Sequence, residues 1–285
     1  MLVQHTAHSD GLRARYERDG YVIVRDVLDA DLIREAQAHV DWLLARHPDL
    51  RGEQLGHTLL TRDAFWVRLI SDDRLLDVAE QFIGSNIALF ASHYIAKPPF
   101  DGQPVLWHQD GSFWPLDPME VSTLWLAVDD SDPENGCMRV VPGSHVLDLQ
   151  AMQQRTDVAN VLSAEIDPAL VDEAQAVDIV LKAGDVSMHH PNIVHGSNAN
   201  TSPRWRRGLT IRYIPTSTRI TAEGQWPSAF ALRGTTMPNV NHYHPWPLYA
   251  EDQSMRFENA DAWNSKAAAW NSQSMDLQQS VGQDY

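Results

Sequence analysis

The stretch RRGLTIRYI, residues 206–214, alternates between two kinds of side chain. Successive residues of a β-strand point to opposite faces. One face would hold Arg206, Gly208, Thr210 and Arg212, and the other Arg207, Leu209, Ile211 and Tyr213. If the apolar face packs on helices, the polar face lines the interior of a barrel and places a guanidinium there.

Short strand-like runs recur after residue 86, and turn-forming Pro, Gly and Asn separate them. They cover residues 86–96, 121–128, 137–141, 176–181, 185–190 and 206–214. Before them, the pattern predicts helices at 10–19, 31–46 (capped by Asp29) and 72–83 (capped by Ser71), with a strand at 20–28. This order predicts a mainly β fold with flanking helices, built on a double-stranded β-helix (jelly roll, cupin-like) core.

No linker or internal repeat divides the chain, so we expect a single domain over residues 1–285. It would have a helical N-terminal part at about 10–84, a jelly-roll core at about 86–215 and a C-terminal extension at about 216–285. From about residue 251 the extension is rich in Gln, Ser, Asn and Ala, which is compatible with a peripheral helix or with a loose end.

The composition indicates a small-molecule partner. The 285 residues carry a net charge of −16, which disfavours binding to nucleic acid or to an anionic membrane. A single cysteine, Cys137, leaves no internal disulfide, and no apolar run reaches the length of a membrane span or a signal peptide. We expect a cytoplasmic protein, and the sequence does not indicate its oligomeric state.

A metal site is predicted from WHQD, residues 107–110, and from HHPNIVHGS, residues 189–197. On a strand, His108 and Asp110 point the same way, and a jelly roll can bring His195 to them. Two imidazoles and one carboxylate form the ligand set of a non-haem Fe(II) centre that leaves positions open for O₂ and a co-substrate. The usual co-substrate is a keto-diacid, whose far carboxylate needs a cation such as Arg206 or Arg212.

These motifs resemble the phytanoyl-CoA dioxygenase family of Fe(II)- and 2-oxoglutarate-dependent oxygenases. The resemblance covers roughly residues 15–215. It rests on GYVIVRDVLD (20–29), KPP (97–99), WHQD (107–110), ENGCMRVVPGSH (134–145) and AGDVSMHHPNIVHGSNANTSPRWR (183–206).

The resemblance implies a role for several residues. His108, Asp110 and His195 would bind Fe(II), and Arg206 would bind 2-oxoglutarate. Ser197, Trp125 and Lys97 match positions beside the co-substrate. Related halogenases replace the metal-binding Asp with a small residue, so Asp110 favours hydroxylation or another oxidation over halogenation. Phe113 and Trp114, just beyond the ligands, are expected to be walls of the substrate pocket.

The function predicted from these residues is oxidation of an unactivated C–H bond of a small metabolite or natural-product intermediate, with O₂ consumed and succinate and CO₂ released. Two alternatives stay open. A jelly roll without redox chemistry would be a binding module, and a cupin-like barrel with a Lewis-acid metal would be a hydrolase or isomerase. Dependence on 2-oxoglutarate separates the oxygenase from the hydrolase.

Overall fold

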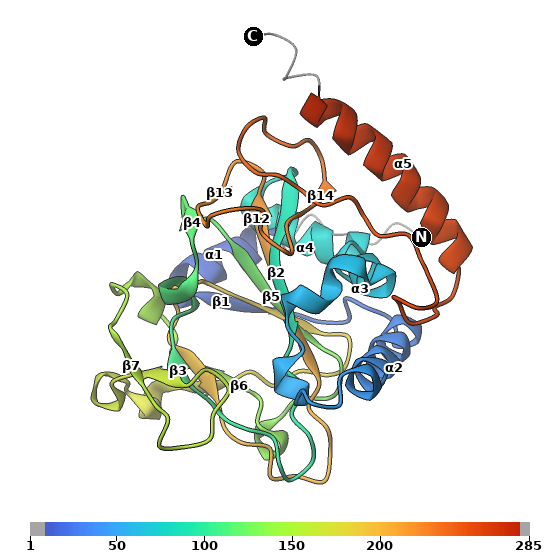
Figure 1. Ribbon diagram of the computed structural model, residues 1–285. Helices are drawn as coiled ribbons and strands as arrows, with labels where there is room; N and C mark the ends of the chain where they lie inside the picture. The colour runs from blue at the N-terminus through green and yellow to red at the C-terminus, as the bar shows by residue number, and fades with distance from the viewer. Residues whose placement is uncertain (1–8, 280–285) are drawn as a thin grey trace.

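Two antiparallel sheets face each other in the computed structural model, which describes residues 9–279 (Figure 1). The larger sheet has the order β1 (Tyr21–Val24), β10 (Val186–His189), β5 (Ser122–Ala127), β12 (Gly208–Pro215), β2 (Ile87–Tyr94) and β14 (Phe230–Arg233). The smaller sheet has the order β3 (Val105–His108), β11 (His195–Ser197), β6 (Met138–Val140) and β9 (Val177–Asp178). The predicted jelly roll is confirmed.

The remaining elements flank these sheets. Two short pairs join β13 (Arg219–Ile220) to β4 (Leu116–Asp117) and β7 (Met152–Gln154) to β8 (Ala164–Ile166). The α-helices are α1 (Ser9–Asp19), α2 (Ala30–Arg46), α3 (Ala64–Ile70), α4 (Asp73–Ile83) and α5 (Ala260–Gln279). The 3₁₀ helices are η1 (Gly52–Gln54), η2 (His57–Arg62), η3 (Asp110–Phe113), η4 (Pro133–Asn135), η5 (Ser144–Val146), η6 (Pro168–Leu170) and η7 (Glu173–Gln175).

Strand β12 has the two faces that its sequence predicts. Leu209, Ile211 and Tyr213 are buried in the main hydrophobic core together with residues of α2, α3 and α4. Thr210 and Arg212 line a cavity on the opposite face. Figure 1 shows these helices on one side of the larger sheet and the smaller sheet on the other. The site therefore lies between the sheets, and the helices close the outer face.

Helix starts follow the capping residues, with one correction. Asp29 caps α2 and accepts hydrogen bonds from the backbone N–H groups of Asp31 and Leu32, as predicted. The predicted cap Ser71 is wrong, because it ends α3, a helix that the sequence analysis did not predict. Asp72 caps α4 instead, accepting from the N–H of Arg74.

The C-terminal extension is part of the folded core. Strand β14 forms an edge of the larger sheet beside β2, and Trp246 stacks on Trp263 and Trp270 of α5 with ring centroids 5.2 and 5.1 Å apart. Of the two possibilities for the tail, a peripheral helix or a loose end, residues 260–279 form a helix. Residues 1–8 and 280–285 lie outside the described range. In the described part of the chain, no helix combines the length and apolarity that a membrane crossing needs.

A buried polar network ties this extension to the helices. His39 contacts Asp63 through Nε2 at 2.7 Å and the Tyr94 hydroxyl through Nδ1 at 2.9 Å. Ser254 donates to Asp63 at 3.1 Å and accepts from the backbone N–H of Phe65. All four polar side chains are buried, so their mutual hydrogen bonds replace those lost to water.

Candidate active site

The three predicted metal ligands come together between the sheets. His108 ends β3 and His195 begins β11, and the two are direct cross-strand partners. One ligand atom from each of His108, Asp110 and His195 lies within 4.8 Å of the other two, and all three residues are buried. Strand pairing therefore sets the separation of the imidazoles.

Asp110 reaches the cluster from a turn, which corrects the expectation that it shares a strand with His108. Strand β3 ends at His108 and Asp110 begins η3. Between them Gln109 is extended, with φ −119° and ψ 119°, so the flanking side chains still point the same way. The Gln109 side chain points away, donating to the carbonyl of Asn192 and accepting from the N–H of Gln150.

The hydrogen bonds of both imidazoles leave a nitrogen free for a metal. Nδ1 of His108 lies 2.8 Å from the carbonyl oxygen of Leu106, and Nδ1 of His195 lies 3.0 Å from that of Ile193. A carbonyl only accepts, so each Nδ1 carries the hydrogen and each Nε2 keeps its lone pair. Burial, followed by the neighbouring His108, holds the pKa of His195 well below its usual range. A neutral imidazole is the form that binds metal.

Asp110 is held in its ionised form. Burial opposes ionisation, but the positive charge of Arg212 and contacts with His108 and His189 outweigh it and keep the pKa of Asp110 well below its usual range. His189, on β10, is buried with no hydrogen-bond partner at either ring nitrogen, and its Nε2 lies 3.6 Å from Asp110 Oδ2. The sequence did not distinguish His189 from a packing residue, because its neighbours are contributed by other strands.

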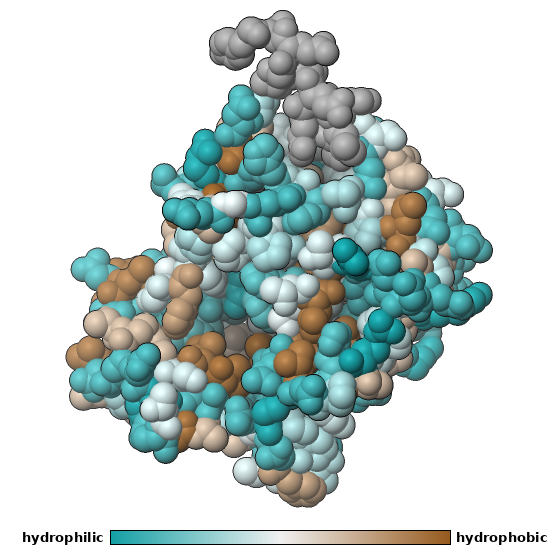
Figure 2. Space-filling view, viewed as in Figure 1, coloured by the Kyte–Doolittle hydropathy of each residue, from teal (hydrophilic) through white to brown (hydrophobic). Residues whose placement is uncertain are grey.

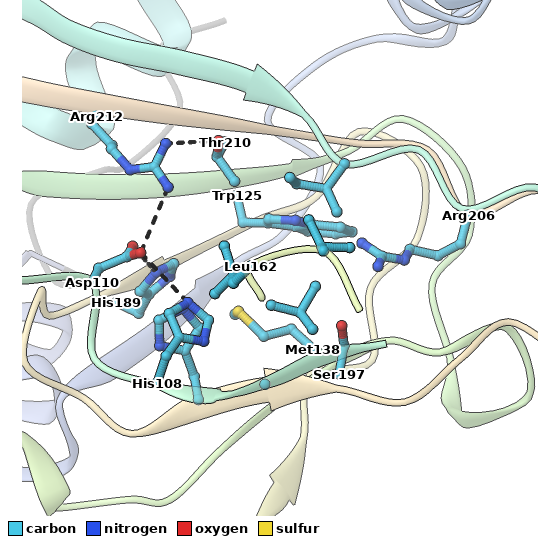
Figure 3. Close-up of a pocket in the computed structure, with 15 residues that line it drawn as sticks. His108, Asp110, Trp125, Met138, Leu162, His189, Ser197, Arg206, Thr210 and Arg212 are labelled. Carbon is cyan, nitrogen blue, oxygen red and sulfur yellow. Dashed lines mark hydrogen bonds and ion pairs between the residues drawn. The ribbon is translucent and has the colours of Figure 1, made fainter. Parts of the chain in front are cut away.

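A cavity of about 80 Å³ extends from this cluster between the sheets (Figure 3). Figure 3 shows Asp110, His108 and His189 at one end and Arg206 at the other, with Trp125, Leu162 and Met138 between them. The full lining is Ile95, Val105, His108, Asp110, Trp125, Met138, Val161, Leu162, His189, His195, Gly196, Ser197, Arg206, Thr210 and Arg212. Figure 2, viewed as in Figure 1, shows a hollow in the face turned toward the viewer, with hydrophobic residues along part of its rim.

Arg206 is a buried cation without a counter-charge in its immediate contacts. The residue is 1% exposed, and its Nε and Nη2 find no hydrogen-bond partner in the part of the chain that the structure describes. Burial lowers the pKa of Arg206 to about 10, so the group remains charged at neutral pH. Its guanidinium carbon lies 5.3 Å from the Trp125 ring centroid, a cation–π contact. An unpaired buried charge is costly, which indicates that a bound anion completes this end of the cavity.

Gly208 makes room for Trp125. A Cβ at residue 208 would lie 2.0 Å from an atom of the indole ring, so any side chain there would push Trp125 out of its place beside Arg206. Trp125 and Ser197, which the family resemblance places beside the co-substrate, both line the cavity.

Lys97 lies behind the cavity wall, which differs from the predicted contact with the co-substrate. It does not line the cavity, and its Nζ donates to Ser197 Oγ at 2.7 Å and to the backbone carbonyl of Asn198. Its backbone pairs with that of Arg206 through two hydrogen bonds of 3.0 Å. Burial, and then the charge of Arg206, hold the pKa of Lys97 well below its usual range. Lys97 is therefore placed to hold the Ser197 hydroxyl through its side chain and Arg206 through its backbone.

The two predicted substrate-wall residues also lie outside the cavity lining. Phe113 is 47% exposed, with its ring centroid 6.4 Å from that of His108. Trp114 covers Arg212, whose guanidinium carbon lies 4.9 Å from the indole centroid. Phe113 ends η3 and Trp114 follows it, so neither residue continues strand β3. Val161 and Leu162 form part of the wall instead, and no sequence pattern singled them out.

The phytanoyl-CoA dioxygenase (PhyH) family matches residues 16–208, which include all three predicted ligands and Arg206. The chain belongs to the phytanoyl-CoA dioxygenase family. The predicted resemblance to this family of Fe(II)- and 2-oxoglutarate-dependent oxygenases is confirmed, and the site has donors suited to both the iron and the co-substrate.

Two curated relatives illustrate the breadth of the family. The chain is 34% identical over 148 residues to a probable alpha-ketoglutarate-dependent hypophosphite dioxygenase of Stutzerimonas stutzeri, a match that covers 51% of each chain. It is 28% identical over 236 residues to an ectoine dioxygenase of Sphingopyxis alaskensis, with 73% of this chain and 76% of the relative covered. The matched part thus spans about half the length of the first relative and three quarters of the second.

Solved structures share the fold over most of the chain. The non-heme monooxygenase ThoJ superposes with a TM-score of 0.72 at 24% identity and covers 92% of this chain and 96% of its own. The epimerase SnoN, in complex with Fe³⁺, alpha ketoglutarate and nogalamycin RO, superposes with a TM-score of 0.64 at 26% identity and covers 87% of this chain and 98% of its own.

Proposed function

We propose that this protein is an Fe(II)- and 2-oxoglutarate-dependent dioxygenase that hydroxylates, or otherwise oxidises, an unactivated C–H bond of a small metabolite or natural-product intermediate. Succinate and CO₂ are its co-products. His108, Asp110 and His195 hold the iron, and Arg206 binds the far carboxylate of 2-oxoglutarate. The single cysteine suits a reducing compartment, so we place the enzyme in the cytoplasm.

The observation that carries this proposal is the unpaired, fully buried guanidinium of Arg206 at the opposite end of a cavity that begins at the ligand cluster. A keto-diacid that chelates the metal has a second carboxylate to offer this cation, whereas Lewis-acid hydrolysis at the metal does not by itself require a cation at that place. Guanidinium binds carboxylate through two parallel hydrogen bonds, which fixes the diacid in one orientation.

The remaining lining residues position and protect the reactants. Bound Fe(II) supplies the activation of O₂, with 2-oxoglutarate as the source of two electrons. Ser197 offers a hydroxyl near Arg206, and Lys97 holds that hydroxyl in place. Trp125, Met138, Val161 and Leu162 give the cavity an apolar wall that excludes water from the reacting atoms.

The test is an anaerobic titration of purified protein with Fe(II) and 2-oxoglutarate, followed by the weak visible charge-transfer absorption of the chelate. We expect the band in wild type. His108→Ala should lose it because the metal loses a ligand, and Arg206→Met should require at least about tenfold more 2-oxoglutarate because a charge-assisted pair is gone.

Circular dichroism controls for folding in each variant. Metal-loaded, folded wild type without the band would overturn the proposal and favour a metal site without redox chemistry. An Arg206→Met variant with unchanged affinity for 2-oxoglutarate would overturn the assignment of the far carboxylate to Arg206. Succinate release with candidate substrates then identifies the C–H donor.

A further inference from the structure

A second guanidinium, that of Arg212, lies at the metal end of the cavity and is held in one position. Its Nη1 donates to His93 Nδ1 at 2.9 Å and to Thr210 Oγ1 at 3.2 Å. The indole of Trp114 covers its face at 4.9 Å. Arg212 differs from Arg206 in this respect, since three neighbours from three segments of the chain fix it before any ligand arrives.

Part of the Arg212 guanidinium remains without a hydrogen-bond partner. Its Nε is buried and makes no hydrogen bond, and its Nη2 lies 3.6 Å from Asp110 Oδ1, beyond hydrogen-bond distance. Figure 3 shows this edge of the guanidinium turned toward Asp110 and the cavity. These donors therefore face the space beside the metal, on the side away from Arg206.

The charges of the loaded site do not balance without another anion. Among the residues lining the cavity, the charged ones are Asp110, Arg206 and Arg212. Fe(II) brings two positive charges and each guanidinium one, whereas Asp110 brings one negative charge and 2-oxoglutarate two. Arg206 pairs with the far carboxylate and the metal takes the rest, so one positive charge is left over. Arg212 carries it.

The neighbours of Arg212 do not cancel this charge. His93 accepts its hydrogen bond, and burial followed by the charge of Arg212 holds the pKa of His93 well below its usual range, which leaves that imidazole neutral. His57 stacks on His93 at 4.9 Å between ring centroids, and burial followed by Arg212 also lowers its pKa. Once the metal shares the Asp110 charge, no carboxylate of the lining is left for Arg212.

We propose that Arg212 binds an oxyanion of the substrate, so that the enzyme oxidises an organic acid, either a carboxylate or a phosphoryl compound, in preference to a neutral or cationic molecule. This proposal rests on the proposed function, because the uncompensated charge arises when iron and 2-oxoglutarate are bound. A partly buried, preorganised guanidinium binds an oxyanion by charge-assisted hydrogen bonds and loses little entropy in doing so.

The test compares isosteric anions and neutral molecules on the anaerobic Fe(II)–2-oxoglutarate complex. Acetate and acetamide have the same shape and differ in charge, and methylphosphonate provides the phosphoryl arm. Each is titrated while the charge-transfer band is followed. We expect at least one anion to perturb the band in wild type and acetamide to need about tenfold or higher concentration.

Variants assign the anion effect to a residue. Arg212→Met should weaken anion binding about tenfold or more, Arg212→Lys should retain part of it, and the exposed Arg219→Met is the matched control that should behave as wild type. Anion binding to the iron itself would survive in Arg212→Met and would count against the proposal.

The outcomes separate this proposal from the proposed function. A wild-type band that responds equally to acetate and acetamide, or to neither and not to methylphosphonate, overturns the assignment of Arg212 while the oxygenase stands. Absence of the band itself, in folded and metal-loaded protein, overturns the oxygenase. A response to methylphosphonate alone identifies a phosphoryl substrate, and a response to acetate alone identifies a carboxylic acid.

Discussion

The sequence predicted the positions of some residues of this site correctly and those of others incorrectly. The three predicted ligands and Arg206 sit in short motifs with fixed spacing, so the sequence singled them out, and the structure brings them together around one cavity. Lys97 was assigned from its match to a position in the family, and Phe113 and Trp114 were assigned because they follow the WHQD motif. Their side chains depend on the η3 turn and on the pairing of Lys97 with Arg206, which are non-local. Val161 and Leu162 reach the cavity from a loop without a pattern.

The buried charge of Arg206 is expected to lower the stability of the ligand-free protein while serving the binding of 2-oxoglutarate. Its buried, unpaired donors destabilise the ligand-free fold, so Arg206→Met should raise the free energy of unfolding of metal-free protein by about 1–2 kcal/mol, after allowing for the lost contact with Trp125. Urea denaturation measures this, with the exposed Arg219→Met as control. A less stable Arg206→Met protein would show that the guanidinium already has favourable partners without a ligand.

At the scale of helices and strands, the sequence predicted the features that depend on residues close together in the chain. The alternation in β12 and the capping of α2 by Asp29 were confirmed, because each depends on residues within one turn or one strand. Strand β14 and helix α3 were not predicted. Phe230–Arg233 pairs with β2 across more than a hundred residues of sequence, and the short α3 is fixed by its burial in the core.

The cap of α2 gives a pH-dependent prediction. The Leu32 N–H and then Arg74 lower the pKa of Asp29 to about 2, so its stabilising contribution is complete above the unfolded pKa near ~3.9 and is lost as the pH falls toward 2. Asp29→Ala should cost about 1 kcal/mol at pH 7 and less at pH 3. Urea unfolding at both pH values, with the exposed Asp148→Ala as control, measures the difference; an equal cost at both values would contradict it.

At the scale of the whole molecule, the extension after residue 215 is held by contacts on both sides. The Ser254–Asp63–His39 network joins it to α2, and the Trp246–Trp263–Trp270 stack joins α5 to β14, whose Ala231 carbonyl accepts from both Trp246 and Trp270. Composition alone did not decide whether this tail is a helix or a loose end, because its aromatic residues find their packing partners only when the sheet is assembled.

We therefore expect the chain to unfold as one cooperative unit. Tryptophan fluorescence and far-UV circular dichroism should give coincident urea transitions, and Trp263→Ala should lower the free energy of unfolding by about 3–5 kcal/mol without splitting them. The exposed Leu248→Ala is the control. Two separate transitions would instead show that the C-terminal extension is an independent unit.

The pairing of His108 with His195 has a consequence for the folding of the chain during its synthesis. The two imidazoles are neighbours across β3 and β11, yet 87 residues of sequence separate them, and Arg206 follows later still. A ribosome delivers the chain from its N-terminus, so the nascent polypeptide carries two of the three predicted ligands until the strand that begins at His195 emerges. The complete ligand set that would hold iron therefore exists only after β11 has paired with β3.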